Sequence, residues 1–362
     1  MRFFPPHIGL DVSGTSLKAV SLKQVEGGLL GLEAFGKDYL PPGAIVEGEI
    51  KDTASVLKTL KSILEKKENG FPKTKYVVAS LPEEKTFSRI LEMPSVLKEK
   101  EMAEALRWET ESNLPLSLDE VYYDYGILNR NVAAGHHDVM VNAISKKIVD
   151  SYVNFFKSNG WQLLALELET VSVHRALFNK QSLIKEAVLV MDIGATKTRF
   201  MIVAEGIIRF TSSNSLAGSR FSQTLSEHFP VNMKEAEFMK RLVGLDKNQE
   251  KGQELLEALK PALLLLKEQI QNYIGFFESH PSKEKLHENA QKISKIMLIG
   301  GGAGLWGLGD WLSQEISLPV LTGNPLSKIK NSHSAKIKMS LEDSLSYATA
   351  IGLALRSFEE LS

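Results

Sequence analysis

The most informative segment of this sequence is Val190-Met191-Asp192-Ile193-Gly194-Ala195-Thr196-Lys197-Thr198-Arg199-Phe200. An apolar run from Val188 to Met191 predicts a buried strand, and a β-rich run from Phe200 to Val203 predicts its hairpin partner. The polar turn between them holds a carboxylate, a glycine and hydroxyl groups. Backbone N–H groups of such a turn can bind phosphate, and the acid can hold the accompanying metal ion. Taken alone, the pattern is more often ordinary turn chemistry.

A second copy of this pattern stands near the N-terminus, as Ile8-Gly9-Leu10-Asp11-Val12-Ser13-Gly14-Thr15-Ser16-Leu17-Lys18-Ala19-Val20. Alignment of the copies pairs residues of like chemistry: Asp11 with Asp192, Thr15 with Thr196, and Lys18 with Arg199. The offset, 192 − 11 = 181, is half of the 362 residues. A repeat at half-length predicts two related halves, each presenting a phosphate-binding hairpin to a shared cleft.

The two acids also predict a metal ion. Two carboxylates facing one polyphosphate would repel it, because a pair of unit charges about 4 Å apart is worth roughly 4 kcal/mol at an effective dielectric of about 20. A divalent cation between acids and phosphates reverses the sign. We therefore expect Asp11 and Asp192 to hold Mg²⁺.

Length and composition limit the kind of protein that can contain these motifs. A chain of 362 residues exceeds what one core usually serves, so at least two domains are expected. The apolar fraction of 43% and charged fraction of 24% are those of a soluble globular protein. A net charge of −1 gives no electrostatic case for nucleic acid, and the absence of cysteine excludes disulfides and thiolate catalysis. The longest apolar run, Ala262 to Leu266, is too short to span a bilayer.

Hydrophobic periodicity predicts a self-contained α+β insert at 73–162. It comprises strands at 86–91, 121–128 and 138–144 and helices at 98–113 and 149–158. In the second half we expect helices at 221–228, 233–242, 255–277 and 341–358. Pro261 lies inside the third of these helices and favours a helix start near Lys260.

A run of glycines follows the strand expected at 294–299, as Gly300-Gly301-Gly302-Ala303-Gly304. A buried strand that leads into such a run brings bare backbone against a flat or anionic ligand. The alternative interpretation is a close crossing between the strand and the following helix.

Two acids, Glu167 and Glu169, stand two residues apart on an apolar strand that leads into a helix. Because side chains two residues apart point to the same side of a β-strand, both carboxylates are expected on one face of this strand. A solvated strand end is one interpretation. The other is that one of the two orients water or metal where the halves hinge, which makes both candidate catalytic residues.

These pieces, in this order, resemble the actin-like ATPase superfamily. Asp11 to Lys18 and Asp192 to Thr198 resemble its two phosphate motifs, and Ile296 to Gly304 resembles its adenosine motif. The ranges 166–177 and 345–355 resemble its two interdomain connecting helices. The resemblance implies a two-lobed α/β fold, with duplicated mixed β-sheet domains around a nucleotide cleft, that binds ATP and Mg²⁺.

Within this superfamily the chain is most similar to the PilM family of type IV pilus assembly proteins, itself similar to the cell-division protein FtsA. The similarity is carried by Ile8-Gly9-Leu10-Asp11, Leu91-Glu92-Met93-Pro94, Leu106-Arg107-Trp108-Glu109, Leu114-Pro115, Asp124-Tyr125, Leu166-Glu167-Leu168-Glu169 and Asn324-Pro325. FtsA continues into a membrane helix after the second connecting helix, where this sequence stops, and this difference favours PilM.

The resemblance implies four subdomains and assigns site residues to them. Subdomain 1A takes 1–72, 163–182 and 338–362; subdomain 1C, as in FtsA, takes 73–162; 2A takes 183–218 and 288–337; and 2B takes 219–287. Asp11 and Asp192 would hold magnesium through water. The residues implied to face the phosphates are Gly14, Thr15, Ser16, Lys18, Gly194 and Thr196. Lys197 stands in the second phosphate turn, where the family has no fixed cation. Gly218 is followed by Ser219, whereas the family often has a Gly-Gly pair at these two positions. Glu237 and Lys240 would contact ribose and base, and Gly300, Gly301, Gly302 and Ala303 would lie against the adenosine.

The function implied is that of a cytoplasmic ATP-binding adaptor with at most slow ATPase activity. The surface formed by subdomains 1A and 1C would bind the N-terminal cytoplasmic tail of a PilN-like inner-membrane protein. This partner would keep the chain at the membrane without direct insertion into it. Pilus motor ATPases and a second copy of the chain are further candidate partners. Alternatives of the same fold are an FtsA-like filament former and a small-molecule kinase. A kinase needs a general base and a polar acceptor pocket, and the sequence shows no residue cluster for either.

Overall fold

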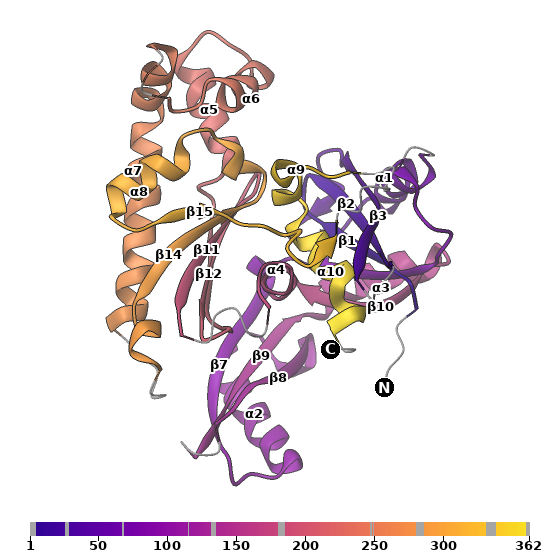
Figure 1. Ribbon diagram of the computed structural model, residues 1–362. Coiled ribbons are helices and arrows are strands. Elements are labelled where there is room, and N and C mark those ends of the chain that lie inside the picture. The colour runs from indigo at the N-terminus through magenta and orange to yellow at the C-terminus, as the bar shows by residue number, and fades with distance from the viewer. Residues whose placement is uncertain are drawn as a thin grey trace. The chain divides into compact units, whose positions relative to one another are not determined.

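The computed structural model describes residues 5–25, 29–66, 69–114, 116–131, 135–179, 185–246, 248, 250–279, 286–330 and 338–359. Its helices and strands are labelled in Figure 1. The chain divides into two compact units. Unit 1 consists of Met1–Ser172, Ile329–Lys338 and Thr349–Ser362, and unit 2 of Val173–Lys328 and Met339–Ala348.

Unit 1 is built on a six-stranded sheet of order β10-β6-β1-β2-β3-β16. Its strands are β1 (Ile8–Val12), β2 (Ser16–Gln24), β3 (Leu30–Tyr39), β6 (Tyr76–Leu81), β10 (Gln162–Leu168) and β16 (Ile329–Lys330). The first three form an antiparallel meander, whereas β6 runs parallel to both β1 and β10. A two-stranded ribbon, β4 (Ile45–Val46) and β5 (Glu49–Ile50), leads into the first helix.

Alternation along β1 explains how the helices of unit 1 cover its sheet. Ile8, Leu10 and Val12 point into the core formed with α1 (Thr53–Glu65) and α3 (Lys146–Ser158). Gly9 points the other way, against the backbone of α10 (Ala348–Glu359) at Ala350 and Ala354. Helix α1 begins where the Asp52 side chain accepts a hydrogen bond from the Ser55 N–H at 3.0 Å, a standard N-cap.

A separate antiparallel sheet of order β7-β9-β8 also belongs to unit 1. Its strands are β7 (Thr86–Pro94), β8 (Val121–Asn131) and β9 (His136–Ser145). The short helix η3 (Glu83–Lys85) precedes β7, and α2 (Glu99–Asn113) and the short helix η4 (Leu118–Glu120) connect β7 to β8. Met102 and Leu106 of α2 pack on Val139 and Val141 of β9 in a small core of their own. The α+β pattern expected at 73–162 is confirmed as secondary structure.

Unit 2 is built on a five-stranded sheet of order β13-β12-β11-β14-β15. Its strands are β11 (Ala187–Ile193), β12 (Thr198–Ala204), β13 (Ile207–Asn214), β14 (Ile293–Ile299) and β15 (Val320–Thr322). The helices are α5 (Gly218–His228), α6 (Met233–Leu242), α7 (Glu250–Ser279), α8 (Leu308–Ile316) and α9 (Leu341–Leu345), with the short helices η6 (Glu288–Ala290) and η7 (Gly301–Gly304). One sheet face, with Leu189, Met191 and Ile193, packs on α5, α6, α7 and α8, of which α7 is the long helix in Figure 1.

The two large sheets repeat one topology. Read from β15, the order β15-β14-β11-β12-β13 matches β10-β6-β1-β2-β3 strand for strand. The hairpin register is also the same, because Asp11 pairs with Lys18 and Asp192 with Arg199. The half-length repeat expected from the sequence is therefore confirmed as a structural duplication.

Two helix predictions are wrong. Helix α7 runs unbroken from Glu250 to Ser279 with Pro261 inside it, because Leu259 and Leu263 on either side are fully buried and hold both halves to the core. The helix expected at 341–358 is divided, since Ser346 and Tyr347 bond three residues back and close α9 before α10 begins. Among the described residues, no helix combines the length and hydropathy needed to cross a membrane.

Helix α4 (Glu169–Leu177) contains one of the points where the chain passes between the units, after Ser172. A second such point lies after Ala348, at the start of α10. Both fall within the ranges expected for the connecting helices.

Candidate functional site

The turn between β1 and β2 is held by local hydrogen bonds. The Ser13 hydroxyl donates to the Ser16 carbonyl at 3.0 Å and accepts from the Ser16 N–H at 3.1 Å, while the Leu40 N–H donates to the Thr15 carbonyl at 3.0 Å. Gly14 at the tip is exposed, and a Cβ added there would meet no atom within 4 Å. The fold does not require glycine at this position, so the space beside it is open to a ligand.

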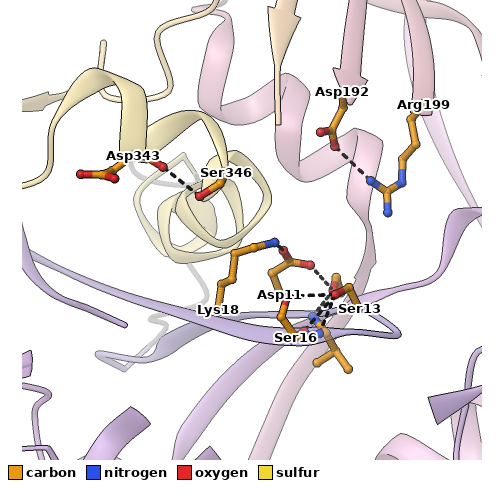
Figure 2. A network of polar contacts seen from close by, with 10 residues as sticks. Asp11, Ser13, Ser16, Lys18, Asp192, Arg199, Asp343 and Ser346 are labelled. Carbon is orange, nitrogen blue, oxygen red and sulfur yellow. Dashed lines mark hydrogen bonds and ion pairs between the residues drawn. The ribbon is translucent and has the colours of Figure 1, made fainter. Parts of the chain in front are cut away.

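An ion pair closes each of the two hairpins (Figure 2). Lys18 Nζ lies 2.7 Å from Asp11 Oδ2, and Arg199 Nη1 lies 3.0 Å from Asp192 Oδ2. The Ser80 hydroxyl donates to Asp11 Oδ1 at 3.4 Å. Lys18, for which we predict a phosphate contact, lies against Asp11 here, because the two residues are cross-strand partners in the hairpin register. The sequence carried this signal, since residues 11 and 18 stand symmetrically about the two central turn residues, 14 and 15.

The second phosphate turn is fastened to the start of α5. Within the turn, the Gly194 N–H donates to the Lys197 carbonyl at 2.8 Å. The N–H groups of Gly218 and Ser219 donate to the carbonyls of Gly194 and Ala195 at 3.0 and 2.8 Å. These amides of α5 are therefore used to fix the turn. Thr196 lies exposed at the tip, with Lys197 beside it partly exposed.

Lys240 of α6 braces the same region from inside the protein. Its side chain is buried, and its ammonium group donates to the Gly218 carbonyl at 2.8 Å and lies 2.6 Å from the Glu237 carboxylate. Burial lowers the pKa of Lys240, although the pairing with Glu237 opposes this effect. Lys240 thus has internal partners in this structure, and its contact with a nucleotide stays a prediction.

Glu237 is the more exposed member of this pair. Burial acts to raise its pKa, but the hydrogen bond and charge of Lys240, together with the Ser222 hydroxyl at 2.8 Å and the charge of Arg241, outweigh it, so the pKa lies below its ordinary value. The carboxylate is therefore held ionised and oriented while part of it still faces solvent. Of the Glu-x-x-Lys pair, Glu237 is the one positioned to meet a ligand.

The glycines of the run 300–304 differ in their surroundings. Gly300 has a φ of 84°, and a Cβ there would overlap Asp192 Oδ1, whereas a Cβ on Gly302 would overlap the Ile193 side chain. These two glycines serve close packing on the end of β11. A Cβ on Gly301 would meet only Ser346 Cβ, at 3.9 Å, and one on Gly304 would meet nothing within 4 Å.

Open backbone at Gly301 lies beside the end of α9. The Gly300 N–H donates to the Leu345 carbonyl at 3.0 Å, and the Ser346 hydroxyl donates to the Asp343 carbonyl at 3.0 Å (Figure 2). Both contacts lie inside unit 2. Gly301 is therefore held in place by its neighbours while its own surface stays bare, and Ala303 follows it within η7.

Four predicted residues from four separate segments of unit 2 meet at Gly218. A Cβ on Gly218 would lie 3.2 Å from the Gly194 carbonyl oxygen, 3.8 Å from Lys240 Nζ and 3.9 Å from Gly302 Cα. The β11–β12 turn, the start of α5, α6 and η7 thus converge. They form a compact cluster, with Gly301 exposed and Glu237 partly exposed at its edge.

The paired carboxylates of the connecting segment do not share a strand face. Glu167 lies in β10, whereas Glu169 opens α4. Glu167 is buried, accepting from Arg356 Nη1 at 2.5 Å and from the Ser172 hydroxyl at 2.9 Å. It is neither a solvated strand end nor an exposed base.

Sequence reasoning missed Glu83, which caps α4. Its carboxylate accepts from the Thr170 N–H at 3.0 Å and from the Thr170 hydroxyl at 2.5 Å. The partners are 87 residues apart, and no local pattern links them.

The duplicated sheets, each with an acid and a cation across its first hairpin, define an actin-like ATPase fold. MreB5 of Spiroplasma citri bound to ADP shares this fold with a TM-score of 0.56 and 16% identity, over 99% of this chain and 98% of that one. The ethanolamine utilization protein EutJ from Carboxydothermus hydrogenoformans shares it with a TM-score of 0.55 and 16% identity, over 98% and 91%.

Within that class, the family model described as type IV pilus assembly protein PilM matches residues 9–358, and the chain belongs to this family. A solved PilM-PilN type IV pilus biogenesis complex contains a chain that matches with a TM-score of 0.80 and 24% identity, over 98% of both chains.

Proposed function

We propose that this chain is an ATP-binding adaptor of type IV pilus assembly. It binds Mg–ATP and the cytoplasmic tail of a PilN-like inner-membrane protein, and so works in the cytoplasm at the membrane surface. The proposal of nucleotide binding is supported by the convergence of Gly194, Gly218, Lys240 and Gly302 beside the exposed backbone of Gly301. The proposal of a PilN-like partner is supported by family membership and by the similarity to the PilM-PilN complex.

The two acids suit the proposed metal. Carboxylate oxygen is a ligand that Mg²⁺ prefers, and Asp11 and Asp192 each already hold one cation. Bound Mg²⁺ would be held by these two carboxylates and would neutralise phosphate charge, and the Lys18 ammonium and Arg199 guanidinium groups would then be available to the phosphates. The open turn at Gly14 and Thr15, the exposed Thr196 and the partly exposed Lys197 would offer the remaining contacts.

Binding without rapid hydrolysis follows from the surroundings of the candidate catalytic residues. Glu167 is engaged by Arg356 and Ser172, and Glu169 is buried at the start of α4. A general base must reach the water whose proton it takes. We therefore propose slow turnover at most, with the nucleotide acting as a conformational ligand.

The nucleotide site is tested by Gly301→Leu. A Cβ at this exposed position meets only Ser346 Cβ, at the ordinary contact distance of 3.9 Å, so we expect stability to stay near that of the wild type, whereas Mg–ATP would lose the surface it lies on. We expect affinity to fall at least about tenfold, or roughly 1.4 kcal/mol, in titration calorimetry. Gly126→Leu is the control, because it makes the same substitution where an added Cβ meets nothing within 4 Å. Unchanged affinity in Gly301→Leu would count against this site.

The partner is tested with a synthetic N-terminal tail of a PilN-like protein. We propose that it binds where the β7-β9-β8 sheet and α2, as a 1C-type subdomain inside 73–162, adjoin the rest of unit 1. Pull-down of the tail by the purified chain, with and without Mg–ATP, is the expected result. Brisk ATP consumption triggered by a small-molecule acceptor, with no tail bound, would favour a kinase instead.

A further inference from the structure

A surface groove of about 670 Å³ lies in unit 1, away from the predicted phosphate turn of that unit. It is bordered by the last turns of α1, by the segment 70–75 and by Asn159 to Trp161. The last two borders lead directly into β6 and β10, which run parallel to β1 in the same sheet. The groove is thus at the edge where these strands begin, whereas the turn at Gly14 follows the end of β1.

The floor of the groove is apolar and fixed. Leu57, Leu64, Phe71 and Trp161 are partly buried side chains that pack on the core of unit 1 and also line the groove. The Trp161 N–H donates to the Phe156 carbonyl at 2.9 Å, and the Gln162 N–H donates to the Lys75 carbonyl at 2.8 Å. Backbone bonds therefore hold two of the walls together, as expected for a preformed site.

The rim is strongly basic in a chain that is nearly neutral overall. Among the described residues that line the groove, Lys61, Lys66, Lys73 and Lys75 stand against one acid, Glu65, giving 4 − 1 = +3 where the whole chain carries −1. All four lysines are exposed. Within the described part of the chain, Lys61, Lys73 and Lys75 form no ion pair. These exposed ammonium groups are available to an anionic ligand.

The shape and the helix ends indicate which anion fits. Helices α1 and α3 both finish at the groove, at Glu65 and Ser158, and helix C-termini carry partial negative charge. They disfavour a compact polyphosphate, but not carboxylates spread along a chain that reaches the rim. A concave site also does not match a flat bilayer surface, whereas an extended peptide can place an apolar side chain on the floor.

We propose that this groove docks an acidic peptide segment of a partner protein, with a leucine or aromatic side chain on the Phe71 and Trp161 floor and carboxylates at the lysine rim. This partner is additional to the nucleotide and the membrane-protein tail. The two proposals stand or fall separately, because the groove test uses neither ATP nor that tail.

The test is a selection of random peptides displayed on phage against the full chain, with Lys73→Glu/Lys75→Glu as soluble competitor. We expect enrichment of Asp and Glu beside Leu, Phe or Trp. A synthetic copy of the best peptide should bind the wild type at least about tenfold more tightly than the double variant, and more weakly as salt rises. Its binding should slow hydrogen exchange at 57–66, 70–75 and 159–161.

The matched control is Lys100→Glu/Lys234→Glu, which makes the same charge change at two exposed positions outside the groove. This control should bind the peptide like the wild type. Failure to enrich acidic peptides, equal affinity for the groove variant, or protection at other segments would overturn the proposal. So would binding of vesicles containing anionic phospholipid that depends on Lys73 and Lys75 while no peptide binds.

Discussion

Replacing Gly352 with alanine is expected to lower the free energy of unfolding by at least about 3 kcal/mol. A Cβ at this position of α10 would overlap the carbonyl group of Ser172 in α4, so the backbone of one helix must move. Helix propensity alone would favour alanine by about 0.5–1 kcal/mol, so the clash has to overcome a gain. Urea denaturation of the full chain measures the difference.

Gly275→Ala is the matched control for this prediction. Gly275 is also inside a helix, α7, but a Cβ there meets nothing within 4 Å. This variant should gain about 0.5–1 kcal/mol, so the two substitutions are expected to act in opposite directions. A Gly352→Ala protein as stable as the wild type would show that α10 and α4 are not in close contact.

The contact between Gly352 and Ser172 lies within unit 1, close to two of the points where the chain passes between the units. Ser172 directly precedes one of these points, and Gly352 follows another closely. The sequence could not identify this contact, because the two positions are 180 residues apart (352 − 172).

Features of the fold and the site that depend on local sequence could be predicted, whereas those that depend on contacts between distant residues could not. Strand alternation, turn glycines and the repeat of Asp11 at Asp192 are local patterns, and they predicted the duplicated hairpins correctly. The ion pair of Glu167 with Arg356 spans 189 residues and depends on how α10 packs, which no local pattern encodes. Pro261 shows the converse, since local propensity predicted a helix boundary that burial of the flanking leucines overrides.

Lys18→Met is expected to destabilise the protein by about 3 kcal/mol. Asp11 is only 4% exposed, and the substitution removes the ammonium group 2.7 Å from its carboxylate while keeping most of the apolar stem. Urea denaturation gives the change in unfolding free energy. Lys51→Met is the control, because the Lys51–Glu49 pair has a similar distance, 2.6 Å, but both side chains are solvent-exposed to a larger extent. Such surface pairs contribute about 0–1 kcal/mol.

The double variant Asp11→Asn/Lys18→Met separates the ion pair from other effects of the lysine. If the loss in Lys18→Met comes from a buried carboxylate without its cation, then removing the carboxylate charge as well should restore most of the stability. A double variant as unstable as the single one would assign the loss to packing of the Lys18 stem.

Mg–ATP then decides which role Lys18 has in the proposed site. If Mg²⁺ takes the place of the Lys18 ammonium beside Asp11, the nucleotide supplies the missing cation, and its thermal stabilisation should be larger for Lys18→Met than for the wild type. If Lys18 instead contributes mainly by contacting phosphate, the variant should gain less. A smaller stabilisation of Lys18→Met would leave the nucleotide site in place and give Lys18 the phosphate contact that its resemblance to the first phosphate motif implies. A larger stabilisation would mean that the Lys18 ammonium group occupies the metal position when no metal is bound.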